Sequence, residues 1–196
     1  LYNSFNTIQS LFSSNKFQIA NEFISNFSDV LRRTIDNSGL LMNPSKEEIT
    51  YLKQYLELEC VKRNGRLNYT LECDDIPESY GMIPSLIIQP IIENSIKHGP
   101  KKPNICIIEI KFEKQDNVIR ISVKDNGPGF PESMKDYTNS KGLQLVRDKI
   151  RIVEQITGKL IEFKIENVYD ETHNCLGVLA VFNMPFFSVD DYEGRT

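Results

Sequence analysis

The sequence predicts an α+β fold: a helical hairpin followed by a mixed, mostly antiparallel sheet with helices on one face. Residues 1–37 carry apolar side chains at intervals of three and four, the period of packed helices, whereas five later segments alternate as strands do. An Asn-Pro-Ser sequence at 43–45 separates the two patterns and breaks the chain. We therefore expect a hairpin over residues 1–43, an α+β domain over 44–188 and a frayed tail over 189–196.

The hairpin is expected to consist of helices over residues 1–13 and 16–37. At about 1.5 Å per residue the second helix is roughly 30 Å long and the first only about 20 Å, so we expect the first to continue upstream of Leu1. Two copies are expected to pair as a four-helix bundle, which makes the protein a homodimer. The expected seam contains Phe5, Ile8, Phe12, Phe27 and Leu31, with Leu1, Phe17, Ala20, Ile24 and Ile35 on the same faces.

The second part is expected to begin with a helix that Ser45 and Glu48 cap and that Gly65 ends. Residues 84–99 and 142–157 are expected to form two more helices. The expected strands are residues 66–73, 105–113, 118–124, 159–167 and 176–184.

Composition excludes several classes of function. A net charge of −4 offers no basic excess for neutralising phosphates, so no nucleic-acid partner is expected. No apolar run approaches the roughly 20 residues that cross a bilayer, so these residues are expected to make no direct membrane contact. The four cysteines form no CxxC pair and only two histidines accompany them, which argues against zinc. Scattered thiols favour a reducing cytoplasm over a disulfide framework.

One candidate site lies in the stretch PSLIIQPIIENSIKHG, residues 84–99, whose apolar start ends in polar residues. Asn94, Lys97 and His98 fall within one helical turn, where an amide oxygen suits Mg²⁺ and the bases suit phosphate. Capping alone also explains a helix that ends in Lys-His-Gly. For Glu93, a role in a pocket and simple solvation remain equally open.

A second candidate site lies in IRISVKDNGPGF, residues 119–130, where an alternating strand runs into a glycine-rich turn. A tight hairpin turn is the alternative interpretation, but it would be followed by another alternating strand. A polar, aperiodic segment of loop length comes next instead, and then Gly142 opens an amphipathic helix. Asp125 can accept a hydrogen bond from a base, and a helix N-terminus favours phosphate, so the pattern indicates a nucleotide pocket with a lid.

The order Asn94, Asp125-x-Gly127-x-Gly129, Gly142 and Gly177 resembles the Bergerat ATP-binding fold, shared by sensor histidine kinases, type II topoisomerases, Hsp90 chaperones and MutL proteins. Within it the chain most resembles bacterial sensor histidine kinases of the LytS/YesM type. Residues 83–99 are similar to their N box almost throughout, residues 51–67 to their linker helix, and residues 1–11 to the segment directly after their phosphoacceptor motif.

This resemblance implies a role for each matching residue. Asn94 would coordinate the Mg²⁺ that bridges the ATP phosphates, with Lys97 and His98 near those phosphates. Asp125 would bind the adenine amino group, and residues 131–141 would form the ATP lid. The remaining ATP-binding positions would be Gly127, Gly129, Ser140, Lys141, Gly142, Leu143 and Gly177. Ser140 replaces a glycine that the family usually has there, so the lid geometry is expected to differ.

The function that this resemblance implies is the cytoplasmic kinase core of a two-component sensor histidine kinase, with the parent protein in the bacterial inner membrane. ATP and Mg²⁺ would be bound and a phosphoryl group relayed through a histidine to a response regulator. The acceptor histidine would precede Leu1 by two positions, and Asn3 would line the regulator's docking surface.

Two alternatives to the kinase are considered. An ATP-hydrolysing machine of the same fold needs a glutamate four residues before Asn94, where this chain has Pro90. A non-catalytic nucleotide-binding and dimerising module is the other alternative, against which the intact Asn94 and Asp125 argue.

Overall fold

The computed structural model describes residues 2–73, 81–100, 104–130 and 140–188. Residues 131–139 of the predicted lid lie outside these described residues, and so does the predicted tail at 189–196. The helices are α1 (Tyr2–Ser13), α2 (Phe17–Ser38), α3 (Ser45–Arg63), α4 (Gln89–His98) and α5 (Lys141–Thr157). The strands are β1 (Met42–Pro44), β2 (Leu67–Cys73), β3 (Met82–Pro84), β4 (Cys106–Gln115), β5 (Val118–Asp125), β6 (Glu162–Tyr169) and β7 (Cys175–Pro185).

The main sheet has the strand order β2-β4-β5-β7-β6. β2 pairs with β4 in parallel, beginning with Leu67 opposite Cys106, and the other three pairings are antiparallel. The connection from β2 to β4 therefore crosses over, and it contains β3 and α4, as a parallel pair requires. This confirms the predicted mixed, mostly antiparallel sheet.

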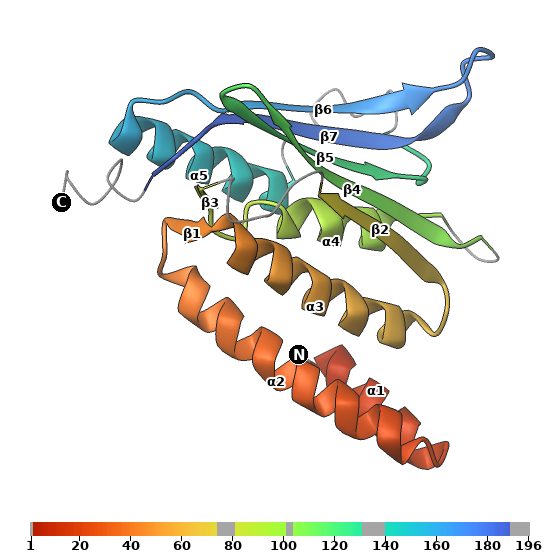
Figure 1. Ribbon diagram of the computed structural model, residues 1–196. Coiled ribbons are helices and arrows are strands. Elements are labelled where there is room, and N and C mark those ends of the chain that lie inside the picture. The colour runs from red at the N-terminus through yellow and green to blue at the C-terminus, as the bar shows by residue number, and fades with distance from the viewer. Residues whose placement is uncertain (1, 74–80, 101–103, 131–139, 189–196) are drawn as a thin grey trace.

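Helices α3, α4 and α5 lie side by side under one face of this sheet (Figure 1). The alternation along β5 explains why, because Ile119, Ile121 and Val123 are buried while Arg120 and Ser122 between them are half-exposed. α4 and α5 each supply a matching apolar stripe, whereas α3 is buried on more than one face because it also packs against α2. On α4 the stripe is Ile91, Ile92 and Ile96, and on α5 it is Leu143, Val146, Ile150 and Val153.

The hairpin of α1 and α2 forms a further layer, which packs against α3 on the side away from the sheet (Figure 1). The predicted seam is only partly right. α2 buries Ala20, as predicted, but also Phe23 and Val30, which the seam omitted, because it contacts α3 as well as α1. Phe5 still meets Phe27 edge to face, with ring centroids 6.1 Å apart.

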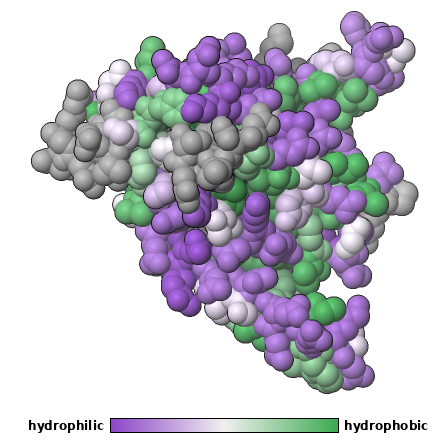
Figure 2. All heavy atoms as spheres, viewed as in Figure 1, coloured by the Kyte–Doolittle hydropathy of each residue, from purple (hydrophilic) through white to green (hydrophobic). Residues whose placement is uncertain are grey.

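Several predicted seam residues face outward, whereas Ile8 and Phe27 pack against the core. Figure 2 shows apolar side chains among polar ones at the lower right, where the hairpin turn lies. The exposed seam positions include Phe5 (58%), Phe12 (41%), Phe17 (54%), Ile24 (37%) and Ile35 (70%).

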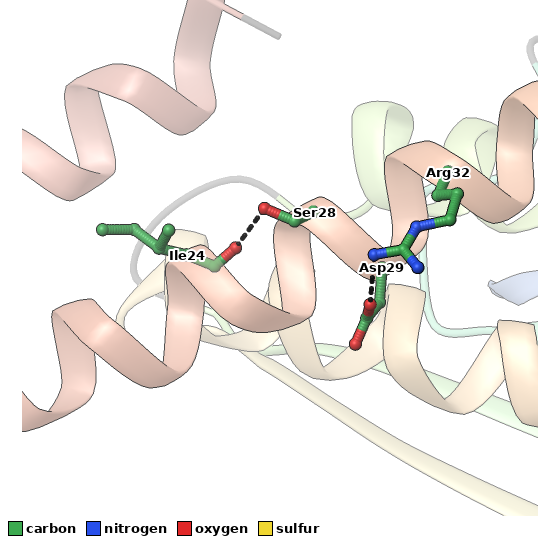
Figure 3. Close-up of polar contacts among 4 residues, drawn as sticks. All are labelled: Ile24, Ser28, Asp29 and Arg32. Atoms are coloured by element: carbon green, nitrogen blue, oxygen red, sulfur yellow. Dashed lines mark hydrogen bonds and ion pairs between the residues drawn. The ribbon is translucent and has the colours of Figure 1, made fainter.

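Polar side chains of α2 near Ile24 find partners within their own helix (Figure 3). Ser28 Oγ donates to the Ile24 carbonyl oxygen at 2.9 Å, and Arg32 pairs with Asp29 at 3.4 Å. Such exposed contacts contribute at most about 1 kcal/mol each, so they add little to the stability of the fold.

Two local predictions were wrong. Residues 82–84 form β3, which pairs with β1, and α4 begins only at Gln89 rather than near Pro84. Leu86 between them has φ +55°, a turn conformation that a helix cannot contain. The expected capping box is also absent, because α3 has Pro44 at its N-cap without a side-chain cap. Glu48 is instead buried and accepts a hydrogen bond from Asn43 Nδ2 at 3.4 Å.

The cysteines Cys60, Cys73, Cys106 and Cys175 are all free thiols. Within the described ranges, no helix combines the length and the apolar character that a membrane span requires.

Candidate functional site

Asp125 is the last residue of β5 and is only 7% exposed. Its Oδ1 accepts hydrogen bonds from the backbone N–H of Gly127 at 2.8 Å and of Val178 at 3.2 Å, and its Oδ2 accepts from Ser95 Oγ at 2.6 Å. A buried carboxylate is costly unless such donors surround it. The three donors therefore hold the Asp125 carboxylate in one orientation between β5, β7 and α4.

Gly177, in β7, allows the two backbones to come together at this point. Its φ is +146°, and a Cβ on it would overlap the carbonyl oxygen of Asp125. Any side chain there would push β7 away from the end of β5 and remove the Val178 hydrogen bond.

The turn after Asp125 packs against the C-terminal end of α4. A Cβ on Gly127 would lie 3.5 Å from both Gly99 Cα and the His98 carbonyl oxygen. Gly129 comes two residues later with φ +76°, in the left-handed region that glycine tolerates best. The glycine-rich turn thus lies against the helix that carries Asn94.

The start of α5 faces the same helix. A Cβ on Gly142 would lie 3.6 Å from Asn94 Nδ2 and 3.6 Å from Pro90 Cβ. Ser140 is the N-cap of α5, and its Oγ accepts the Leu143 N–H at 3.3 Å. Over the part of the chain that the structure describes, the N–H groups of Lys141 and Gly142 have no partner, so two donors remain at a helix N-terminus.

Asn94 is half-buried, and its amide makes no hydrogen bond to any described residue. Lys97 and His98 are exposed one turn further along α4. The structure therefore brings Asn94, Asp125, Gly127 and the α5 start around one end of α4. Glu93 is exposed and accepts a hydrogen bond from Gln89, not from any site residue.

Lys97 also borders a second space, a cavity of about 580 Å³ on the α3 side of α4. Its lining contains Arg63, Arg66, Ile96, Lys97, Gly99, Pro100, Asn104 and Cys106. The cations here stand at the C-terminal ends of α3 and α4, where they complement the helix dipoles. Burial raises the pKa of the Cys106 thiol to about 11, so this thiol is neutral near pH 7.

Sequence reasoning missed two residues of the site. Ser95, buried in α4, orients Asp125. Asn167 on β6 uses both ends of its amide on the backbone of Phe130, accepting from the N–H at 2.8 Å and donating to the carbonyl at 3.0 Å. Neither residue belongs to a recurrent spacing, since each meets its partner only through the sheet and helix packing.

Three other residues considered from the sequence have distinct surroundings. Leu143 is buried at 1% exposure, so its side chain belongs to the core and only its N–H faces the cap. The side chain of Asn3 lies outside the described residues. His173, the second histidine of the chain, occupies an exposed turn between β6 and β7 with φ +63°.

This arrangement defines a class of proteins. A family model described as the histidine kinase-, DNA gyrase B- and HSP90-like ATPase matches residues 83–188, and a model described as histidine kinase matches residues 1–67. The first match covers more than half of the chain, so the chain belongs to the histidine kinase-, DNA gyrase B- and HSP90-like ATPase family.

Individual relatives narrow this class. The sensor histidine kinase YesM of Bacillus subtilis is 27% identical over 155 residues, which is 78% of this chain and 26% of YesM. The sensor protein LytS of Bacillus subtilis is 29% identical over 132 residues, 67% of this chain and 22% of LytS. The predicted resemblance to LytS/YesM-type histidine kinases is confirmed. The chain spans about a quarter of the length of these relatives.

Solved structures show the same fold. The catalytic domain of histidine kinase ThkA superposes with a TM-score of 0.55 at 20% identity, over 74% of this chain and 94% of that one. ThkA in complex with the response regulator protein TrrA superposes with a TM-score of 0.50 at 19% identity, over 86% of this chain and 50% of that one.

Proposed function

We propose that this chain is the kinase core of a two-component sensor histidine kinase, which binds Mg-ATP and transfers its γ-phosphoryl group to a histidine for relay to a response regulator. The observation that supports it best is the Asp125 carboxylate, fixed by three donors beside the unpartnered Asn94 amide. In this proposal residues 1–43 belong to the dimerising hairpin, whose first helix would carry the acceptor histidine ahead of Leu1, and residues 44–188 bind the nucleotide.

Asp125 fits the adenine base. A carboxylate has about four lone-pair sites, and three of them are already used by Ser95, Gly127 and Val178. The remaining site can accept a hydrogen bond from an exocyclic amine. Because the carboxylate is buried and fixed, it would select a donor at that position against an acceptor.

Asn94 and the start of α5 fit the phosphates. Two free N–H groups at a helix N-terminus favour an anion, and Gly142 lies directly against Asn94. The Asn94 oxygen is a hard ligand, and Mg²⁺ is commonly held by few protein oxygens together with substrate phosphates. When bound, Mg²⁺ would neutralise phosphate charge. Lys97 and His98, one turn on, would add positive charge and a further donor near those phosphates.

The partner proposed for the phosphoryl group is a response regulator. ThkA has been solved with such a protein, and the YesM and LytS relatives are sensor proteins, which supports this choice. We also propose that Asn3 lines the docking surface, and that the parent protein is anchored in the bacterial inner membrane with these residues in the cytoplasm.

Calorimetric titration with Mg-ATP tests the site. Asp125→Asn and Asn94→Ala should each weaken binding at least about tenfold, the expected loss of a charged hydrogen bond or a metal ligand. Asp116→Asn, in the exposed β4–β5 turn, and Asn21→Ala, exposed on α2, are matched controls that should bind as the unchanged chain does.

Unchanged affinity in both site variants would contradict the assignment. Absence of Mg-ATP binding by the unchanged chain would instead favour a dimerising module whose nucleotide-binding domain is degenerate and signals only by conformation. Thermal melting of each variant guards against loss of fold, because Asp125→Asn removes an acceptor from buried donors.

A further inference from the structure

A chain of side-chain hydrogen bonds runs from the hairpin to α4. Thr34 on α2 lies 3.1 Å from the Tyr51 hydroxyl on α3, and this hydroxyl donates to Gln89 Oε1 on α4 at 2.7 Å. Gln89 Nε2 then donates to Glu93 Oε1 at 2.7 Å. Four residues on three helices thus lie within hydrogen-bond distance of one another in sequence.

The protons give this chain a defined direction. A tyrosine hydroxyl has one proton, which Tyr51 gives to Gln89, so towards Thr34 it can only accept. The one Thr34 hydroxyl proton is shared between Tyr51 and the Val30 carbonyl oxygen, which lies 2.7 Å from Thr34 Oγ1. Gln89 uses both its amide oxygen and its amide nitrogen, which fixes the orientation of its side chain. Tyr51 is fully buried, and burial raises its pKa to about 12, so the donated proton is present throughout the physiological range.

The helices around this chain are not closely packed. A cavity of about 250 Å³ lies between the hairpin, α3 and α4, and its lining includes Thr34, Tyr51, Tyr55, Gln89 and Glu93. Side chains do not fill this space, so the hairpin, α3 and α4 make fewer contacts with one another here than fully packed helices would. The hydrogen bonds of Tyr51 are therefore a specific polar connection beside a loosely filled junction.

The α4 end of the chain lies beside the candidate site. Gln89 directly precedes Pro90, which contacts the α5 start near Gly142, and Glu93 directly precedes Asn94. A rotation or shift of α4 that breaks the Tyr51–Gln89 bond also moves Asn94, because both residues belong to one short helix.

We propose that Tyr51 is a positioning residue, whose hydroxyl couples the hairpin at Thr34 to the helix that carries Asn94. Nucleotide bound at Asn94 would stabilise α4 and, through Tyr51, the α2 segment around Thr34, and the position of the hairpin would bias α4 in return, since such coupling is reciprocal. This inference rests on the proposed function in that the ligand is Mg-ATP.

Amide hydrogen exchange with and without saturating Mg-ATP tests the coupling, with Tyr51→Phe as the variant. In the unchanged chain, Mg-ATP should slow exchange in the α2 segment around Thr34 about fivefold, a typical coupling. Tyr51→Phe should abolish this slowing while changing the Mg-ATP dissociation constant by less than about twofold, because α2 is mostly ordered either way.

Tyr55→Phe is the matched control. Tyr55 stands one turn further along α3 and stacks on Tyr51 with ring centroids 6.3 Å apart, but its hydroxyl bonds to no described residue. It should leave the slowing in α2 intact. Thr34→Val should abolish the slowing and Thr34→Ser, which keeps the hydroxyl, should preserve it. If the Tyr51 hydroxyl only stabilised the fold, Tyr51→Phe and Tyr55→Phe would not differ in the slowing of exchange, and neither would Thr34→Val and Thr34→Ser.

The coupling is overturned if amide exchange in α2 is still slowed by Mg-ATP in Tyr51→Phe. It is also overturned if the unchanged chain binds Mg-ATP without any slowing of exchange in α2. Either result leaves the proposed function standing. Failure of the unchanged chain to bind Mg-ATP overturns the proposed function itself, and the coupling with it.

Discussion

Glu48 illustrates how a single buried residue responds to its surroundings. Its Oε1 has no hydrogen-bond partner within the described ranges, and the same holds for Asn43 Oδ1 and Ser85 Oγ, all fully buried. Burial raises the pKa of Glu48 from 4.5 to about 7, although Asn43, the Leu86 N–H and Lys149 each lower it. A neutral carboxyl can donate, so protonation provides a hydrogen bond where ionisation leaves an isolated charge.

This predicts a pH dependence of stability. Because the folded pKa of Glu48 is raised, its protonated form stabilises the native state fully below about pH 4.5, and this stabilisation is lost as the pH rises to about 7. The loss is about 3 kcal/mol, from about 1.4 kcal/mol per pKa unit. Glu48→Gln should therefore be more stable than the unchanged chain at pH 8, with the gain shrinking towards pH 5.

Urea unfolding at several pH values measures this difference. Glu47→Gln is the control, since Glu47 is the exposed neighbour in the same helical turn and should change the pH profile little. Parallel pH profiles for the unchanged chain and Glu48→Gln would contradict the buried neutral acid.

At the scale of elements, the N-cap of α5 shows what the serine at position 140 contributes. Ser140→Ala should lower the free energy of unfolding by about 1 kcal/mol, because the Leu143 N–H loses its acceptor, whereas Ser140→Gly should cost only a few tenths. Urea unfolding compares both with Gln144→Ala, an exposed change in the same turn. A Ser140→Ala variant as stable as the unchanged chain would show that the cap contributes nothing.

Periodicity is sufficient to predict the long elements. α2, α5 and the main strands carry their own signals, because each buries one face against the core. The short strands β1 and β3 could not be predicted, since three residues are too few to show an alternation of apolar and polar side chains. Their pairing also depends on tertiary structure. The predicted start of α4 is too early because residues 82–88, which are mostly apolar and mostly buried, are not helical.

The candidate site divides in the same way. Asn94, Asp125 and Gly142 could be predicted as candidate site residues, because an amide, a carboxylate and a glycine at a helix start, in that order, indicate a nucleotide-binding site. Ser95 and Asn167 could not, because a hydroxyl or an amide acquires its role only from a partner brought near by folding. The burial of Phe23 and Val30 on α2 could not be predicted either, since sequence alone does not show that α3 also packs against α2.

At the scale of the whole molecule, the hairpin layer leaves aromatic side chains in solvent. Phe12 is 41% exposed and Phe5 is 58% exposed, on a hairpin that we propose dimerises. Phe12→Ser should weaken self-association at least about tenfold, given about 1.5 kcal/mol or more for burying such a side chain. Sedimentation equilibrium measures it.

Leu160→Ser is the control, because Leu160 is 81% exposed but lies between α5 and β6, far along the chain from the hairpin. It should leave association unchanged. A strictly monomeric unchanged chain at every concentration tested would contradict dimerisation through these residues.

The crossover between β2 and β4 has a consequence for how the site comes into being. Asn94 lies inside that crossover and Asp125 ends a central strand. Val178 lies on β7, which follows α5 and β6 in the chain. Pairings between such distant segments must overcome loop-closure entropy before their contacts compensate for it. No excised helix or hairpin of strands contains the complete site. Nucleotide binding therefore requires that the whole tertiary structure has formed. A cut in the backbone anywhere between residues 94 and 178 breaks the covalent connection between parts of the site.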